Sequence, residues 1–234
     1  MSNDKPQYNT ARDILKVIAI IAMTADHAST FFLAEVTVIY VICQFFGNFT
    51  IVIMCFFIVR GLRHTRSVLN YALRLLVWAM ISEVPFYLLF GMRLNILFTL
   101  LASLLIILLI DRKGWPLGIA ALMLFFPLSW ICDWSIIAPV FTVIYYVLQK
   151  RHIEKLSLLL IPASYFIFRN ILYYETQVEY VVGTISIFLA ALLVYLMMGK
   201  ASENRKGRIP GIVFYAYYSV HLIIIWIINE AIIL

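Results

Sequence analysis

Residues 179–198 read EYVVGTISIFLAALLVYLMM, a stretch whose single charged side chain stands at its first position. A helix needs about 20 apolar residues to cross a hydrocarbon core about 30 Å thick, so this stretch is long enough to span a bilayer. Similar stretches fill the chain of 234 residues, of which 64% are hydrophobic and 13% charged. Soluble domains do not have this composition. Because the stretches lack the alternation of barrel strands, the sequence predicts an all-α polytopic membrane protein.

About nine apolar segments are long enough to be candidate transmembrane helices. Their approximate bounds are Ile14–Ala34, Thr37–Val59, Leu69–Phe90, Leu94–Ile110, Trp115–Cys132, Asp133–Leu148, Leu156–Leu172, Glu179–Met198 and Gly211–Ile233. These segments leave no room for a soluble domain of useful size. We therefore expect residues 1–234 to form a single integral membrane domain, a transmembrane helical bundle.

Nearly all positive charge falls in alternate connections between the predicted spans. Of the 18 Lys and Arg residues, all but Arg93 and Arg169 lie near the N-terminus, in residues 60–74, or near residues 112, 150 and 205. Basic connections stay on the cytoplasmic side of a membrane. The distribution predicts a cytoplasmic N-terminus, an odd number of spans and an outside C-terminus. The net charge of +6 then reflects topology, and we expect no nucleic acid partner.

Several ionisable side chains lie inside predicted spans, where each costs at least about 2.5 kcal/mol to insert and is a functional candidate. They are Asp26, His27, Glu83, Arg169 and His221. At about 1.5 Å per residue, all five fall in one layer in the outer half of the membrane. Asp26 and His27 are adjacent, about 100° apart on a helix, so we expect that they cannot face one another and that they have different partners. A base on one span oriented by a residue of another is the favoured arrangement. The alternative is a set of structural ion pairs, such as Arg169 with Glu83.

Two further groups of polar residues have a structural and a functional interpretation. Asn95 and Thr99, one helical turn apart, either donate hydrogen bonds to a substrate carbonyl or link helices. A basic cluster at the predicted inner face consists of Arg60, Arg63, Arg66 and Arg74. It either anchors the topology or binds a pyrophosphate, which suits the forked guanidinium group. The motifs of nucleotide-hydrolysing enzymes and zinc proteases are absent, and we expect no metal.

Three short motifs suggest a family. Met23-Thr24-Ala25-Asp26-His27, the segment Leu94–Leu100, and Tyr217-Tyr218 ahead of His221-Leu222 together resemble the TraX family, membrane proteins associated with N-terminal acetylation of conjugative pilin. The likeness extends over nearly the whole chain. It implies a multi-pass acetyltransferase of the bacterial inner membrane. Such an enzyme would move an acetyl group from acetyl-CoA to the N-terminal α-amine of a pilin.

The resemblance and the polar layer together define the expected site. His27 or His221 would deprotonate the acceptor amine, and Asp26 or Glu83 would orient that base. Arg74 would bind CoA, together with Arg60, Arg63 and Arg66. The residues expected to contact the substrate are Asn95, Thr99, Tyr217, Tyr218, Arg169 and Asp133.

Two other classes of function use the same residues differently. A transporter or lipid-handling protein would use the polar layer as a substrate pathway, but such folds often show inverted repeats and paired broken helices, which the sequence lacks. An assembly or scaffold protein would use up the polar layer in ion pairs and leave no cavity.

Overall fold

A computed structural model describes residues 10–35, 37–172, 177–198 and 209–233. Within these ranges all regular structure is helical, with nine α-helices, two short 3₁₀ helices and no strand. The α-helices are α1 Thr10–Phe32, α2 Val38–His64, α3 Val68–Phe90, α4 Ile96–Lys113, α5 Trp115–Leu128, α6 Ile137–Arg151, α7 Ser157–Leu172, α8 Gln177–Met198 and α9 Gly211–Ile233. The 3₁₀ helices are η1 Ser129–Ile131 and η2 Glu154–Leu156. The all-α prediction is confirmed, and each predicted segment lies mainly on one α-helix. The basic residues expected near Lys5 and residue 205 lie outside the described residues.

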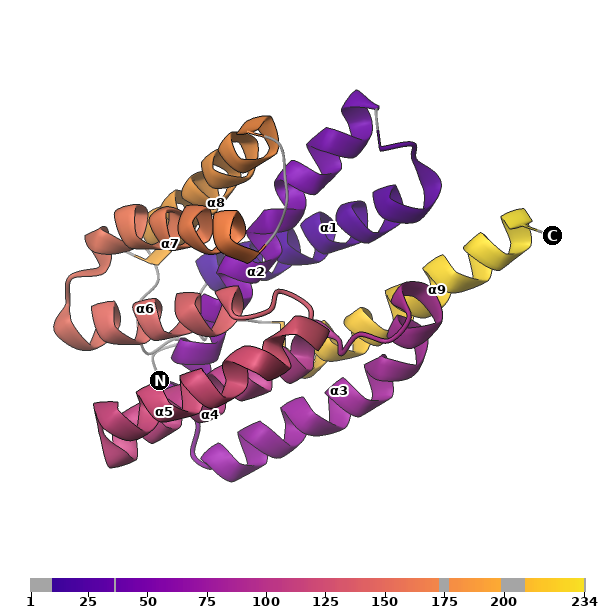
Figure 1. The fold of residues 1–234 in the computed structure, drawn as a ribbon. Helices are drawn as coiled ribbons and strands as arrows, with labels where there is room; N and C mark the ends of the chain where they lie inside the picture. The colour runs from indigo at the N-terminus through magenta and orange to yellow at the C-terminus, as the bar shows by residue number, and fades with distance from the viewer. Residues whose placement is uncertain (1–9, 36, 173–176, 199–208, 234) are drawn as a thin grey trace, which may run out of the picture.

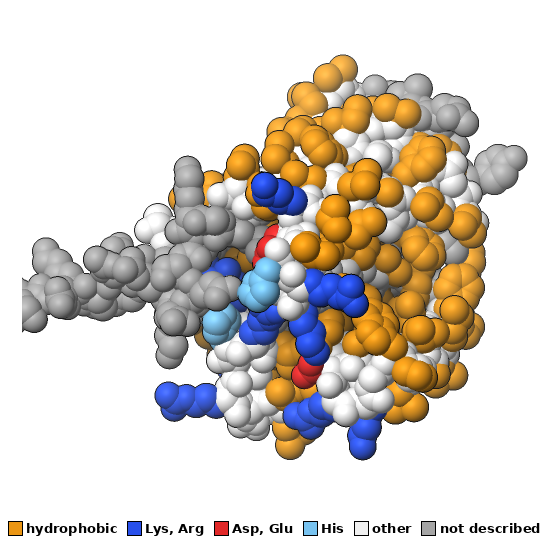
Figure 2. Space-filling view, turned by 90° about the vertical axis from the view of Figure 1, so that its left-hand side faces the viewer, with side chains coloured by type: hydrophobic (Ala, Val, Ile, Leu, Met, Phe, Trp, Pro, Cys, Tyr) orange, Lys and Arg blue, Asp and Glu red, His pale blue; other side chains and the backbone are white. Residues whose placement is uncertain are grey.

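Five of these helices, α1, α2, α3, α8 and α9, are long and apolar enough to cross a membrane. Their outward side chains agree with that environment, since Ile21, Val38 and Val84 of α1, α2 and α3 are 63%, 74% and 66% exposed. Figure 2 shows hydrophobic side chains over much of the visible surface. The chain is therefore a membrane protein, and its nine crossings and the sides of its termini stay predictions.

Local sequence explains where several helices begin and end. The side chains of Thr37, Ser67 and Asn95 accept hydrogen bonds from backbone N–H groups in the first turns of α2, α3 and α4. This is the usual N-cap interaction. Gly91 and Gly114 end α3 and α4 at φ angles of 73° and 91°, a conformation that favours glycine. Short connections then turn each helix back beside its neighbour (Figure 1).

Helix α2 is central to the bundle, and α1, α4, α6 and α8 pack against it. Its buried part runs from Gly47 to Arg60. Helix α9 packs against both α1 and α3. The first and last helices of the chain are thereby neighbours, which brings His27 of α1 to His221 of α9.

The connection between α5 and α6 differs from the sequence prediction. The sixth predicted span was expected to start at Asp133. Instead, residues 132–136 form turns and α6 begins at Ile137. The connection is tied to the chain before α4, because Leu94 N–H donates to the Ile131 carbonyl at 2.7 Å and Asp133 N–H donates to the Leu94 carbonyl at 2.8 Å. These bonds replace helical ones and hold the backbone extended at Cys132.

This connection is recessed within the molecule. With 14 and 15 residues, α5 and α6 are about 21 and 22 Å long, short of the roughly 30 Å hydrocarbon core. In Figure 1, α3, α9 and the turn between α1 and α2 extend further to the right than the α5–α6 connection. Irregular backbone at membrane depth is tolerated where protein buries it or where it lines a cavity.

Positive charge gathers at the opposite end. Arg63, Arg112, Lys113, Lys150 and Arg151 lie in the last turns of α2, α4 and α6. Figure 2 views this end, and Lys and Arg side chains cluster there with two histidines. The bundle thus has a basic end, and toward its other end the α5–α6 connection is set back from the ends of α3 and α9; we call this set-back connection the recess.

Candidate active site

The centre of the site is a pair of histidines from the two ends of the chain. His27 Nδ1 lies 2.9 Å from His221 Nε2, and the two rings are nearly parallel, 7° apart, with centroids 5.1 Å from each other. Both side chains are buried. A hydrogen bond of normal length therefore joins the two rings.

The partners of this pair fix which ring nitrogens carry hydrogen. His221 Nδ1 lies 3.0 Å from the Tyr217 carbonyl, which can only accept, so Nδ1 is the donor. In a neutral His221, Nε2 is then an acceptor, and His27 Nδ1 donates to it. The lone pair of His27 is left on Nε2. That atom can act as a base, whereas both nitrogens of His221 are already used.

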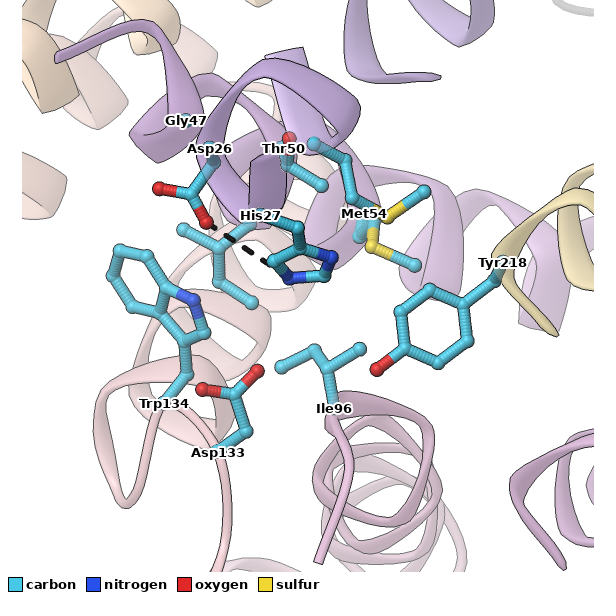
Figure 3. Close-up of a pocket in the computed structure, with 11 residues that line it drawn as sticks. Asp26, His27, Gly47, Thr50, Met54, Ile96, Asp133, Trp134 and Tyr218 are labelled. Carbon is cyan, nitrogen blue, oxygen red and sulfur yellow. Dashed lines mark ion pairs between the residues drawn. The ribbon is translucent and has the colours of Figure 1, made fainter. Parts of the chain in front are cut away.

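A small cavity opens beside this nitrogen. Its volume of about 30 Å³ is enough for roughly two water molecules. The described residues that line it are Met23, Asp26, His27, Gly47, Thr50, Ile51, Met54, Ile96, Asp133, Trp134 and Tyr218. Figure 3 shows the two carboxylates and the His27 ring directed toward the same space.

Asp26 and His27 approach each other more closely than the sequence argument allowed. His27 Nε2 lies 3.9 Å from Asp26 Oδ2, and the Asp26 side chain is 30% exposed. The expectation that these neighbours could not face one another is wrong, because both side chains bend toward the cavity. Gly47 of α2 makes room, since a Cβ there would lie 2.5 Å from Asp26 Oδ1.

Asp133 reaches the cavity from the recessed connection. Thr99 Oγ1 donates to its carbonyl at 2.7 Å, which fixes the backbone at that point. Trp134 and Ser135 follow with φ angles of 60° and 41°, unusual for residues with a side chain. Such strain is kept only where the surroundings enforce it, often at functional sites. The result places a second carboxylate close enough to Asp26 for their charges to interact.

The two tyrosines before His221 have different roles. The Tyr217 ring stacks on His221 at 5.4 Å, and its hydroxyl lies 2.7 Å from Thr24 Oγ1. Tyr217 thus supports the histidine pair from outside the cavity. Tyr218 lines the cavity, and its buried hydroxyl makes no hydrogen bond of normal geometry with the described residues.

Glu83 and Asn95 form a separate pair. Glu83 Oε2 accepts from the Asn95 side chain at 2.7 Å and from its backbone N–H at 3.1 Å. Glu83 therefore helps to hold the start of α4, and no hydrogen bond joins it to either site histidine among the described residues. The expectation that it orients the base is corrected.

Asn95 and Thr99 also use their polar groups within the protein. The Asn95 amide donates to the Ala79 carbonyl at 2.8 Å, and Thr99 donates to the Asp133 carbonyl. Of the two interpretations of these residues, the structure favours links between helices. They act on the site by positioning α4 and the Asp133 backbone.

Arg169 is absent from the described residues that line the cavity. Its guanidinium group lies 5.7 Å from the Tyr165 ring centroid, on the same helix α7. Among the described residues, the ion pairs do not include one between Arg169 and Glu83. Of the five ionisable residues predicted to share one layer, only Asp26, His27 and His221 therefore lie together.

The four expected CoA-binding arginines lie near the basic end, away from the cavity. Arg60 is buried with its guanidinium group 5.9 Å from the Phe56 ring centroid. Arg74 is exposed, 5.9 Å from the Tyr71 ring centroid, and Arg63 and Arg66 are exposed. From Gly47 beside the cavity to Arg60 is about 20 Å along α2.

One further ion pair belongs to the basic end. Asp111, beyond the predicted span of residues 94–110, accepts from Tyr146 and from Lys150. These hydrogen bonds, that from Tyr146 first, hold the pKa of Asp111 below its ordinary value. The pair is largely exposed and plays no part in the cavity.

Sequence reasoning missed most of the residues that line the cavity, and Gly47 and Trp134 are the two that shape it most. A glycine inside an apolar helix is a known signal for close approach of a neighbour, and Gly47 gives that signal. Trp134 follows an aspartate within an apolar run, but nothing in the sequence shows that its backbone turns inward.

The fold and the site define an all-helical membrane protein with a buried histidine pair beside two carboxylates. The family model described as TraX protein matches residues 11–229, and the chain belongs to the TraX family. It is 31% identical over 228 residues to the probable fimbrial assembly protein FimC, serogroup H1, of Dichelobacter nodosus, covering 89% of this chain and 91% of that protein. No solved structure matches the chain.

Proposed function

We propose that this protein is a membrane-embedded acetyltransferase that moves an acetyl group from acetyl-CoA to the N-terminal α-amine of a pilin-like protein. The observation that carries the proposal is the Nε2 of His27, which has no hydrogen-bond partner among the described residues and faces the cavity. An α-amine has a pKa near 8 and is largely protonated at neutral pH, so transfer to it requires a base.

His27 would take one proton from the ammonium group and release it to solvent. The freed nitrogen lone pair then attacks the thioester carbonyl carbon, which forms the N–C bond. When the tetrahedral intermediate collapses, the C–S bond breaks and the thiolate leaves. The second amine proton passes through His27 to the sulfur, so the products are an amide and a thiol.

His221 and Tyr217 would act as positioning residues in this scheme. The Tyr217 carbonyl holds His221 in one tautomer, and His221 holds the His27 ring with Nε2 toward the cavity. Asp26, 3.9 Å from Nε2, would stabilise the imidazolium formed after proton transfer.

The basic end supports a cytoplasmic donor. Clustered arginines suit the phosphates of CoA, and the positive-inside pattern would place them at the cytoplasmic face. We assign Arg74, Arg60, Arg63 and Arg66 to this role. The acetylated end of CoA would then have to reach about 20 Å from the basic end to the cavity.

The similarity to a fimbrial assembly protein supports a pilin-like acceptor. In the proposed topology the N-terminus is cytoplasmic, nine helices cross the bacterial inner membrane, and the recess faces outward. A pilin N-terminus freed on the outer side would meet the cavity there.

The test is the mass of a candidate pilin isolated from cells with and without this protein. Acetylation at the N-terminal amine only when the protein is present supports the proposal. A pilin with the same mass in both strains, at normal protein level, contradicts it.

A further inference from the structure

We infer that the cavity binds the acceptor in its protonated form, as a primary ammonium group held between Asp26, Asp133 and Trp134. The inference rests on the proposed function, because it names how that function's acceptor is recognised. In this binding step, Trp134 and the carboxylates of Asp26 and Asp133 would select an acceptor with a free amine, before the acetyl group is transferred.

The charge balance of the cavity favours a cation. Two carboxylates line it, and no Lys or Arg is among its described lining residues. The hydrogen bond to His221 orients the His27 ring, and with hydrogen on Nδ1 alone this ring is neutral. Arg93 interacts with Asp133 electrostatically but does not line the cavity. Partly buried carboxylates are costly unless a cation or hydrogen bonds compensate them, so a bound ammonium would stabilise the site.

A second, independent observation is the Tyr218 hydroxyl. Tyr218 is fully buried and lines the cavity, and its hydroxyl makes no hydrogen bond of normal geometry with the described residues, although the Ile96 backbone interacts with it. A buried hydroxyl that is incompletely hydrogen-bonded is costly, so a polar ligand at this oxygen would stabilise the site. An ammonium group carries three N–H donors, and the two carboxylates and this hydroxyl oxygen supply three acceptors.

Trp134 closes the side of the cavity opposite His27 (Figure 3). Its ring packs against Tyr165, with centroids 6.4 Å apart, so a second aromatic residue supports it. Indole is the strongest aromatic partner for a cation. The strained backbone at Trp134 therefore places both the carboxylate of Asp133 and an aromatic ring at the same cavity.

The size and composition of the site favour a primary ammonium group. A cavity of about 30 Å³ suits a compact ammonium group better than a bulky guanidinium. Among the described residues, His, Cys, Asp and Glu side chains do not gather in threes as a metal site requires. A primary amine is the cation that fits.

Equilibrium binding to the purified full-length protein in detergent tests the inference. The probe is alanyl-alanine amide, which has a free α-amine, and the uncharged comparison is its N-acetyl derivative. We expect the amine to bind at least about tenfold more tightly, as for a charge-assisted hydrogen bond. Equal affinity of the two probes for the wild-type protein would overturn the inference, and this comparison needs no variant.

Variants test which residues make the protein bind the charged probe more tightly than the uncharged one. Asp133→Asn should bring the affinity ratio of the two probes toward one. Trp134→Leu should weaken amine binding about two- to fivefold, with Trp134→Phe affected less. Trp130→Leu is the matched control, since Trp130 is 58% exposed and does not line the cavity. An unchanged ratio in a folded Asp133→Asn variant would also overturn the inference.

The outcome separates this inference from the proposed function. If the probes are discriminated as expected but no acetyl group is transferred, the ammonium site stands and the acetyltransferase proposal fails. If acetyl transfer proceeds while both probes bind alike, the proposal stands and the ammonium site fails.

Discussion

At the scale of single residues, a chain of hydrogen bonds distinguishes two histidines that look equivalent in sequence. Both lie in family motifs at similar predicted depths, but His221 has a partner on each ring nitrogen. Within the part of the chain that the structure describes, His27 has a hydrogen-bond partner only on Nδ1, and its Nε2 faces the cavity. The sequence named both candidates, and the structure favours His27 as the base.

Replacing His27 with glutamine should lower the acetylation rate about 10²- to 10⁴-fold while the protein stays folded and inserted, because glutamine keeps hydrogen bonding but is no base. His221→Ala should have a smaller but strong effect, since it frees the His27 ring to turn. Rates come from mass analysis of a pilin-like peptide. His152→Asn, in an exposed turn, is the control. Undiminished acetylation by His27→Gln at normal protein level would show that another residue acts as the base.

Arg74→Ala should weaken acetyl-CoA binding roughly 10- to 100-fold if the guanidinium group contacts a phosphate, a contact worth about 1.5–3 kcal/mol. Arg112→Ala, at the same basic end, serves as the matched control, and binding is measured in detergent. Unchanged affinity would leave Arg74 as a topology anchor only.

At the scale of elements, hydropathy located the helices because burial in lipid demands long apolar runs. It could not show how each helix is rotated, so Glu83 and Arg169 were placed beside the histidines on depth alone. Glu83 turns instead to Asn95. The recess between α5 and α6 was also missed, because the bonds from Leu94 that hold it join segments far apart in sequence.

The close approach of α1 and α2 gives a prediction for Gly47. Gly47→Ala would place a methyl group 2.5 Å from Asp26 Oδ1, which requires the side chain or the helix to move. We expect a loss of about 1–3 kcal/mol in stability, measured as a lower unfolding temperature in detergent. Gly211→Ala is the control, because its Cβ would meet nothing within 4 Å. Equal unfolding temperatures for the two variants would show that the helices are less closely packed than described.

At the scale of the whole molecule, the basic end and the recess lie on opposite sides of one helical bundle. The proposed topology places the basic end in the cytoplasm and the recess outside. Among the described residues, five helices show the length and composition of a membrane crossing, so the shorter ones decide the count. Helices α5 and α6 run away from the basic end and back as a pair, so the total is odd whether or not both cross the membrane.

Labelling of introduced cysteines tests this arrangement. Asn3→Cys should react only from the cytoplasmic side and Leu234→Cys only from outside, since the basic connections fix the N-terminus inside. The unmodified protein, with its native cysteines, gives the background. Equal labelling of both positions from one side would mean an even number of crossings.

Acetyl transfer can be measured with the purified protein in lipid vesicles, supplied with acetyl-CoA and a pilin-like peptide bearing a free N-terminus. We expect the peptide to gain one acetyl group, located by mass spectrometry on its α-amine, and His27→Gln to nearly abolish the gain. No gain with the folded wild-type protein, or the same gain with His27→Gln, would contradict this expectation.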